Sequence, residues 1–162
     1  MNHFRKIFAA GQTDNLDLIA CMEASNAFLD LYEVAKKDLD YNGPIERLAS
    51  KIAGMTAYRF GQLQEIEAIL EYLEQREIRT KTEKTRHYME HYQRTLTESV
   101  ARNYADAHQD VQDVRQVTQQ VAYARNLFLG VMKGLEYLHF QISNVTKLKC
   151  AGLEDALMDT SR

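Results

Sequence analysis

The residues with the clearest chemical potential form a basic and aromatic segment in the middle of the sequence. Six basic side chains fall between positions 76 and 94, interleaved with two tyrosines and two histidines: Arg76, Arg79, Lys81, Lys84, Arg86 and Arg94, with His87, Tyr88, His91 and Tyr92. Cations follow the phosphates of a single-stranded nucleic acid, and aromatic faces stack on its bases. We therefore predict a nucleic-acid-binding site at Arg76, Arg79, Lys81, Lys84, Arg86 and Tyr88.

A plainer interpretation of the same segment is a solvated helix face with mixed charges. Its tyrosines also have a competing role, because an apolar stripe starts with them and continues at a spacing of four residues: Tyr88, Tyr92, Leu96, Val100 and Tyr104. This spacing predicts that the stripe winds along one helix. We expect Tyr92 to pack in the core and leave Tyr88 open between packing and base stacking.

Catalytic and metal-binding motifs are sparse. The sequence lacks the nucleophile-elbow, phosphate-loop, zinc-protease and dinucleotide-binding signatures. Glu83, His87 and His91 have helical spacing that suits zinc, but no fourth ligand is visible. Glu136 and His139 form one Glu-x-x-His pair, whereas a di-iron bundle needs two. We predict a protein that is not an enzyme and has no cofactor and no metal.

Composition and charge limit the remaining classes. The chain has 162 residues and a net charge of −3, with only 7 Gly and 1 Pro, which argues against a turn-rich β fold. Residues 11–75 carry 12 acids and 5 bases, whereas residues 76–102 carry 7 bases and 4 acids. No long apolar run or secretory signal is recognisable, and the two cysteines are far apart. We expect a cytoplasmic protein with unpaired, buried thiols and no membrane partner.

Helical periodicity organises the chain into elements that position the basic segment. Apolar spacing predicts a first helix from a cap at Asp14 or Asn15 to about Tyr41, where Asn42-Gly43-Pro44 is a turn signal. A second helix follows from Ile45 to Leu73, with Gly54 and Gly61 inside it. Residues 74–86 have almost no apolar signal, so the pattern leaves helix and loop open there.

The last predicted helix carries a coiled-coil-like seam of apolar residues at spacings of three and four: Val111, Val114, Val117, Val121, Ala124, Phe128, Val131, Leu135 and Leu138. Gly152 is the expected stop, and residues 153–158 are expected to add a last turn. A long amphipathic helix with few partners in its own chain buries its stripe against copies of itself. We therefore predict a homo-oligomer whose interface contains Val111, Val114, Val117, Val121, Phe128, Val131 and Leu135.

The predicted fold class is all-α, with long amphipathic helices in a bundle that packs in a homo-oligomer through the carboxy-terminal helix. The expected division is an acidic helical region, 1–75, and a basic junction followed by the assembly helix, 76–162. A monomeric bundle that buries the valine seam within the chain is the alternative, since 162 residues suffice for such a core.

Residues 109–152 resemble the UvsY family of phage recombination mediators. The resemblance rests on Asp110-Val111, on Gly130 within an amphipathic helix, on Phe140-Gln141-Ile142, and on Ala151-Gly152. It implies a ring-forming helical protein that binds single-stranded DNA, contacts a single-strand-binding protein and helps to load a RecA-like recombinase. It also implies DNA contacts at Arg79, Lys81, Lys84, Arg86 and Tyr88, and an assembly role for the carboxy-terminal helix.

Two functions follow as hypotheses. The first is an oligomeric, single-stranded-DNA-binding recombination mediator or accessory protein in a host cytoplasm. The second is a helical structural or inhibitory interaction module, such as a phage virion, assembly or host-factor-binding protein, with no nucleic-acid role. The pairing of the basic residues discriminates them, because cations that pair inside the chain are withdrawn from a nucleic-acid site.

Overall fold

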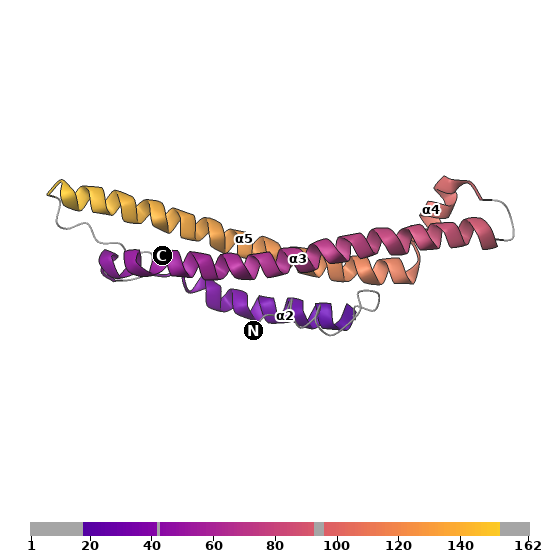
Figure 1. Cartoon of the computed structure of the whole chain (residues 1–162), viewed down its shortest axis with the longest axis horizontal. Helices are drawn as coiled ribbons and strands as arrows, with labels where there is room; N and C mark the ends of the chain where they lie inside the picture. Colours follow the sequence, from indigo (N-terminus) through magenta and orange to yellow (C-terminus); the bar gives the residue numbers. More distant parts are fainter. Residues whose placement is uncertain (1–17, 42, 93–95, 153–162) are drawn as a thin grey trace. The chain divides into compact units, whose positions relative to one another are not determined.

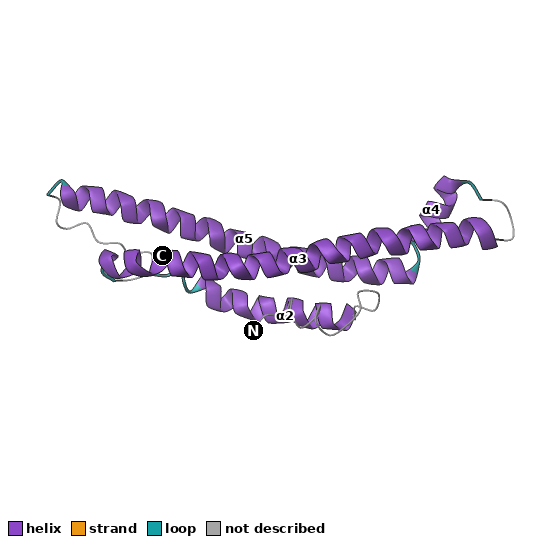
Figure 2. Cartoon of the chain, in the orientation of Figure 1, coloured by secondary structure: helices purple, strands orange, loops and turns teal. Residues whose placement is uncertain are grey.

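The computed structural model describes residues 18–41, 43–92 and 96–152. They form four helices, namely α2 (Leu18–Lys36), α3 (Ile45–His91), α4 (Glu98–Asp106) and α5 (Gln109–Cys150), drawn in Figures 1 and 2. No strand occurs in these three ranges. The all-α prediction is confirmed, and the helices pack against one another. None of the described helices has both the length and the apolar character that a membrane span requires.

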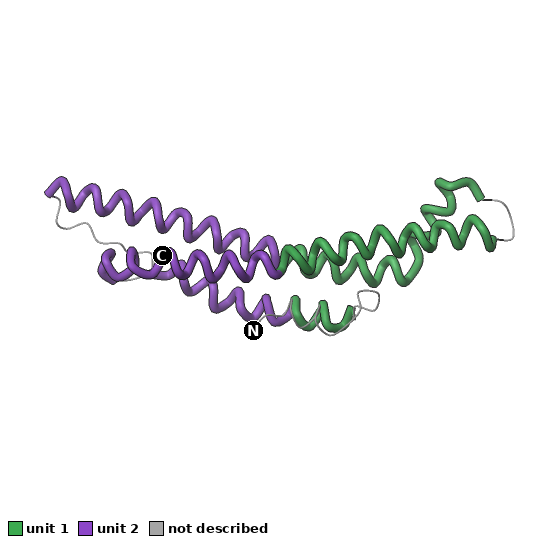
Figure 3. The backbone as a smooth tube through the Cα atoms, viewed as in Figure 1, with its two compact units in different colours: residues 1–25, 66–123 green, residues 26–65, 124–162 purple. Residues whose placement is uncertain are grey.

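The helices are divided between two compact units, coloured separately in Figure 3. Unit 1 combines residues 1–25 with 66–123, and unit 2 combines residues 26–65 with 124–162. Helices α2, α3 and α5 each contribute one stretch to each unit. The expected boundary between residues 75 and 76 falls inside α3, so the compact units do not follow the division into acidic and basic regions.

Helix α3 is longer than the apolar pattern indicated, because it continues through the segment with almost no apolar signal. Residues 74–91 are helical without a break, which settles the choice between helix and loop. The abundant Glu, Gln, Lys and Arg residues there have good helix propensity. The hydroxyls of Thr82 and Thr85 donate to the carbonyls of Ile78 and Lys81, each at 2.8 Å, so these polar groups are satisfied along the helix.

The valine seam lies in the cores of the two units of the same chain. All seven predicted interface residues are at most 3% exposed: Val111, Val114, Val117, Val121, Phe128, Val131 and Leu135. In unit 2, the Phe128 ring lies 6.2 Å from Phe28 and 6.4 Å from Tyr32 of α2, centroid to centroid. The assignment of these residues to an interface between copies is therefore corrected, because other helices of the chain cover the stripe. The monomeric alternative described this packing.

Helix ends differ from the predictions in two places. The first described helix, α2, ends at Lys36 rather than near Tyr41. The stripe from Tyr88 to Tyr104 is not on one helix, since α3 ends at His91 and α4 begins at Glu98. Gly152 is confirmed as the stop after α5: its φ is 85°, and its N–H donates to the Lys149 carbonyl. The predicted cap at Asp14 or Asn15 and the turn 153–158 lie outside the described residues.

Candidate nucleic-acid interface

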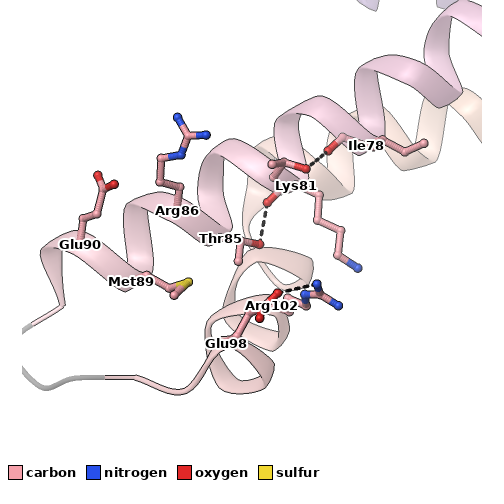
Figure 4. Close-up of a pocket in the computed structure, with 9 residues that line it drawn as sticks. Ile78, Lys81, Thr85, Arg86, Met89, Glu90, Glu98 and Arg102 are labelled. Carbon is pink, nitrogen blue, oxygen red and sulfur yellow. Dashed lines mark hydrogen bonds and ion pairs between the residues drawn. The ribbon is translucent and has the colours of Figure 1, made fainter.

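A pocket of about 600 Å³ opens between α3 and α4 within unit 1 (Figure 4). Two apolar side chains, two hydroxyls, three cations and two carboxylates line it: Ile78, Met89, Thr82, Thr85, Lys81, Arg86, Arg102, Glu90 and Glu98. Figure 4 shows Lys81 and Thr85 on the side of α3 that faces α4 and Arg102, whereas Arg86 and Glu90 extend from the outer side. The pocket thus offers cations next to an apolar wall, which suits an anionic group attached to an apolar body.

Ion pairs tie the basic stretch of α3 to α4 and α5. The Lys81 ammonium donates to the Asp106 carboxylate at 2.8 Å, and the Lys84 ammonium lies 2.6 Å from that of Asp110. Arg115 of α5 bridges two helices, since it donates to Glu77 at 2.7 Å and to Asp106 at 3.1 Å. These pairs bring acids from α4 and α5 against cations that the sequence places in a separate basic segment.

The ion pairs shift the pKa values of the groups involved. The hydrogen bond from Lys81, together with that from Arg115, holds the pKa of Asp106 below its ordinary value. The hydrogen bond from Lys84 does the same for the pKa of Asp110. Hydrogen bonds to Glu77 and Asp106 raise the pKa of Arg115. All these side chains remain partly in contact with water, at 22–55% exposure, so solvent screens each pair.

An aromatic cluster closes the end of the same helices. Tyr92, just after α3, stacks on Tyr104 of α4 with ring centroids 5.5 Å apart. Tyr88 lies 5.6 Å from Tyr104 and 6.2 Å from His108, which precedes α5. A hydrogen bond with Tyr104 raises the pKa of the Tyr92 phenol. Tyr92 and Tyr104 are 45% and 42% exposed, so the pair presents aromatic surface to solvent.

The predicted site residues are only partly brought together. Lys81 and Arg86 line the pocket, Lys84 turns to Asp110, and Tyr88 packs inside the aromatic cluster. Arg76 and Arg79 lie on earlier turns of α3, and Arg94 lies outside the described residues. The expectation for Tyr92 is corrected, because it is more exposed than the half-buried Tyr88.

Sequence reasoning missed two parts of this site. Arg102 contributes a third cation to the pocket, and Tyr104 supplies the second ring of the exposed stack. The alternation of Arg102 and Tyr104 on one short helix was the available signal. His87 and His91 stack with centroids 4.7 Å apart, but within the described ranges no group of three or more His, Cys, Asp or Glu side chains is arranged to hold a metal ion.

Comparisons with protein-family models, with curated proteins and with solved structures found no match for this chain. The resemblance of residues 109–152 to the recombination mediators therefore stays a prediction from sequence.

Proposed function

We propose that unit 1 binds single-stranded nucleic acid at its α3–α4 pocket and aromatic cluster. The observation that supports this most directly is the exposed Tyr92–Tyr104 stack on the turns next to a pocket lined by Lys81, Arg86 and Arg102. A phosphate would lie among the cations, and a neighbouring base would stack on the exposed ring. In this proposal the protein acts as a non-catalytic accessory or mediator in DNA recombination, the setting that the resemblance implies.

The ion pairs make binding a competition between phosphate and intramolecular carboxylates. Phosphate would have to replace Asp106 at Lys81 and Asp110 at Lys84. Partly exposed ion pairs contribute about 0–1 kcal/mol each, so their replacement has a small cost. We therefore expect modest affinity that weakens steeply with salt, with about −0.7 in the log–log slope for each phosphate neutralised.

The decisive experiment removes the competing carboxylates rather than the cations. An Asp106→Asn, Asp110→Asn variant should bind a fluorescently labelled oligothymidine about two- to fivefold more tightly in an anisotropy titration at low salt. The matched control is Glu71→Gln, Glu74→Gln, which changes the net charge equally at two exposed positions of unit 1 that do not line the pocket. If both variants gain equally, the effect is general electrostatics and the proposed site is wrong.

The aromatic part of the site has its own pair of variants. Tyr104→Ala should weaken binding about tenfold, because stacking on an aromatic side chain contributes about 1–3 kcal/mol per base. Tyr123→Ala is the control, since Tyr123 is also in unit 1 and 58% exposed but is not in the cluster. Equal affinities of the two variants would contradict a stacking role for Tyr104.

A second candidate is a helical protein-interaction module with no nucleic-acid role. The pairing of Lys81 and Lys84 with acids of the same chain favours it, because paired cations present less positive potential to a polyanion. The same titration separates the two functions. If neither the wild type nor the Asp106→Asn, Asp110→Asn variant binds at low salt, the interaction module is the supported function.

A further inference from the structure

Unit 2 contains an apolar groove that the nucleic-acid site does not use. It has a volume of about 880 Å³ and lies between the first turns of α3 and the second half of α5. Phe60 and Phe140 project beside it and are 51% and 66% exposed, whereas small side chains form the α3 edge: Ala49, Ala53, Thr56 and Ala57. The groove therefore combines projecting rings and a hollow on one face.

The groove lies on the side of α3 and α5 away from the turn that follows α2. Arg59 and Gly134 mark the near side, because Arg59 pairs with Asp38 at 2.7 Å and a Cβ on Gly134 would come within 2.7 Å of Leu39. The groove residues Ala57, Met132 and Glu136 are each two positions from Arg59 or Gly134, which is about 200° around a helix. The chain's own turn therefore covers one side and leaves the groove side open.

We propose that this face binds the same face of a second copy of the chain across a two-fold axis. A two-fold interface requires a surface that is complementary to itself. Here the rings of Phe60 and Phe140 can fill the alanine-lined hollow of the other copy, while their own hollow receives the other copy's rings. No charged group lies on the α3 edge of the groove, so the centre of the interface is apolar, as in known interfaces.

The two ionisable groups of the groove also fit self-recognition. Glu136 and His139 are one helical turn apart on α5. An axis that crosses antiparallel α5 helices between them sets each carboxylate against the imidazole of the other copy. A partner of strong net charge would instead meet one group of its own sign, so charge complementarity favours a second copy over an acidic or basic partner.

The expected dimer is weak. Eleven residues line the groove, about half of the 20–30 residues per side in a standard interface. We therefore expect a concentration-dependent dimer with a dissociation constant on the order of micromolar. This interface is independent of the nucleic-acid proposal, and it does not use the buried valines.

The test uses exposed aromatic residues in matched pairs. Phe140 and Tyr137 are both on α5 in unit 2 and are 66% and 69% exposed, but only Phe140 lines the groove. Phe60 and Tyr58 form the equivalent pair on α3, at 51% and 59% exposure. Each residue is changed to Glu, and sedimentation equilibrium of the full chain is measured from about 1 µM to about 1 mM, a range that brackets a weak interface.

We expect the wild type, Tyr137→Glu and Tyr58→Glu to dimerise, and Phe140→Glu and Phe60→Glu to lose at least tenfold in affinity. Circular dichroism confirms that the variants keep their helices. A wild type that stays monomeric throughout this range would overturn the proposal. So would groove variants that associate as strongly as their matched controls.

Discussion

Helices α3 and α5 are held together differently in unit 2 and at the α3–α4 end of unit 1. In unit 2 the buried positions of both helices are apolar, and they include Leu48, Ile52, Leu135 and Leu138, none more than 6% exposed. In unit 1, after the last buried position of α3 at Leu73, the side chains that contact α4 and α5 are Glu77, Lys81, Lys84 and Tyr88.

This difference separates regions that stabilise the fold from a region that can exchange partners. A fully buried Leu or Phe side chain contributes about 1.5–3 kcal/mol, whereas a partly exposed ion pair contributes about 0–1 kcal/mol. Rearrangement is therefore costly in the apolar core of unit 2 and cheap at the ion pairs of unit 1. A ligand that offers its own charges can replace Asp106 or Asp110 without unfolding the helices.

The largest expected effect comes from a cavity in the core of unit 2. Phe128 is fully buried and contacts Phe28 and Tyr32, so Phe128→Ala should lower the free energy of unfolding by about 3–5 kcal/mol. Chemical denaturation followed by circular dichroism measures this loss. Phe140→Ala on the same helix is the control and should change stability by less than about 0.5 kcal/mol. Similar losses for both variants would contradict the assignment of this core.

A buried ion pair in unit 2 sharpens the comparison, because it tests charge against burial. The Arg59 side chain is 6% exposed, pairs with Asp38 at 2.7 Å and donates to Gln62 at 2.8 Å. Asp38→Ala leaves this guanidinium without its counter-charge and should cost about 3 kcal/mol. Asp110→Ala, at the exposed pair with Lys84, should cost at most about 1 kcal/mol. Equal costs would show that burial does not distinguish these pairs.

The smallest expected effect is the pH dependence of the ion pairs in unit 1. The pKa values of Asp106 and Asp110 are lower in the folded chain than in the unfolded one. Their contribution is therefore complete above the ordinary aspartate pKa of about 3.9 and is lost as the pH falls below it through the folded values. Compared with the wild type, the Asp106→Asn, Asp110→Asn variant should lose less stability between pH 5 and pH 2. Parallel pH profiles in denaturant titrations would contradict this assignment.

Local signals in the sequence predicted much of the helical content. Apolar periodicity identified α3 from Ile45 and the full extent of the valine seam in α5, and Gly152 marked the end of α5. Two errors came from using periodicity beyond its range. The spacing of four from Tyr88 to Tyr104 crosses a chain reversal, so Tyr92 and Tyr104 meet face to face from different helices.

By itself, the sequence determined which residues are helical and which face of each helix is apolar, because both depend on contacts between residues three or four positions apart. Only the tertiary structure decided what covers each face. The valine seam is covered within the chain rather than by a copy of it, and Lys81 and Lys84 meet Asp106 and Asp110 after the chain reverses. Periodicity defines the direction of a face, but its partner is selected by the packing of segments that are distant in sequence.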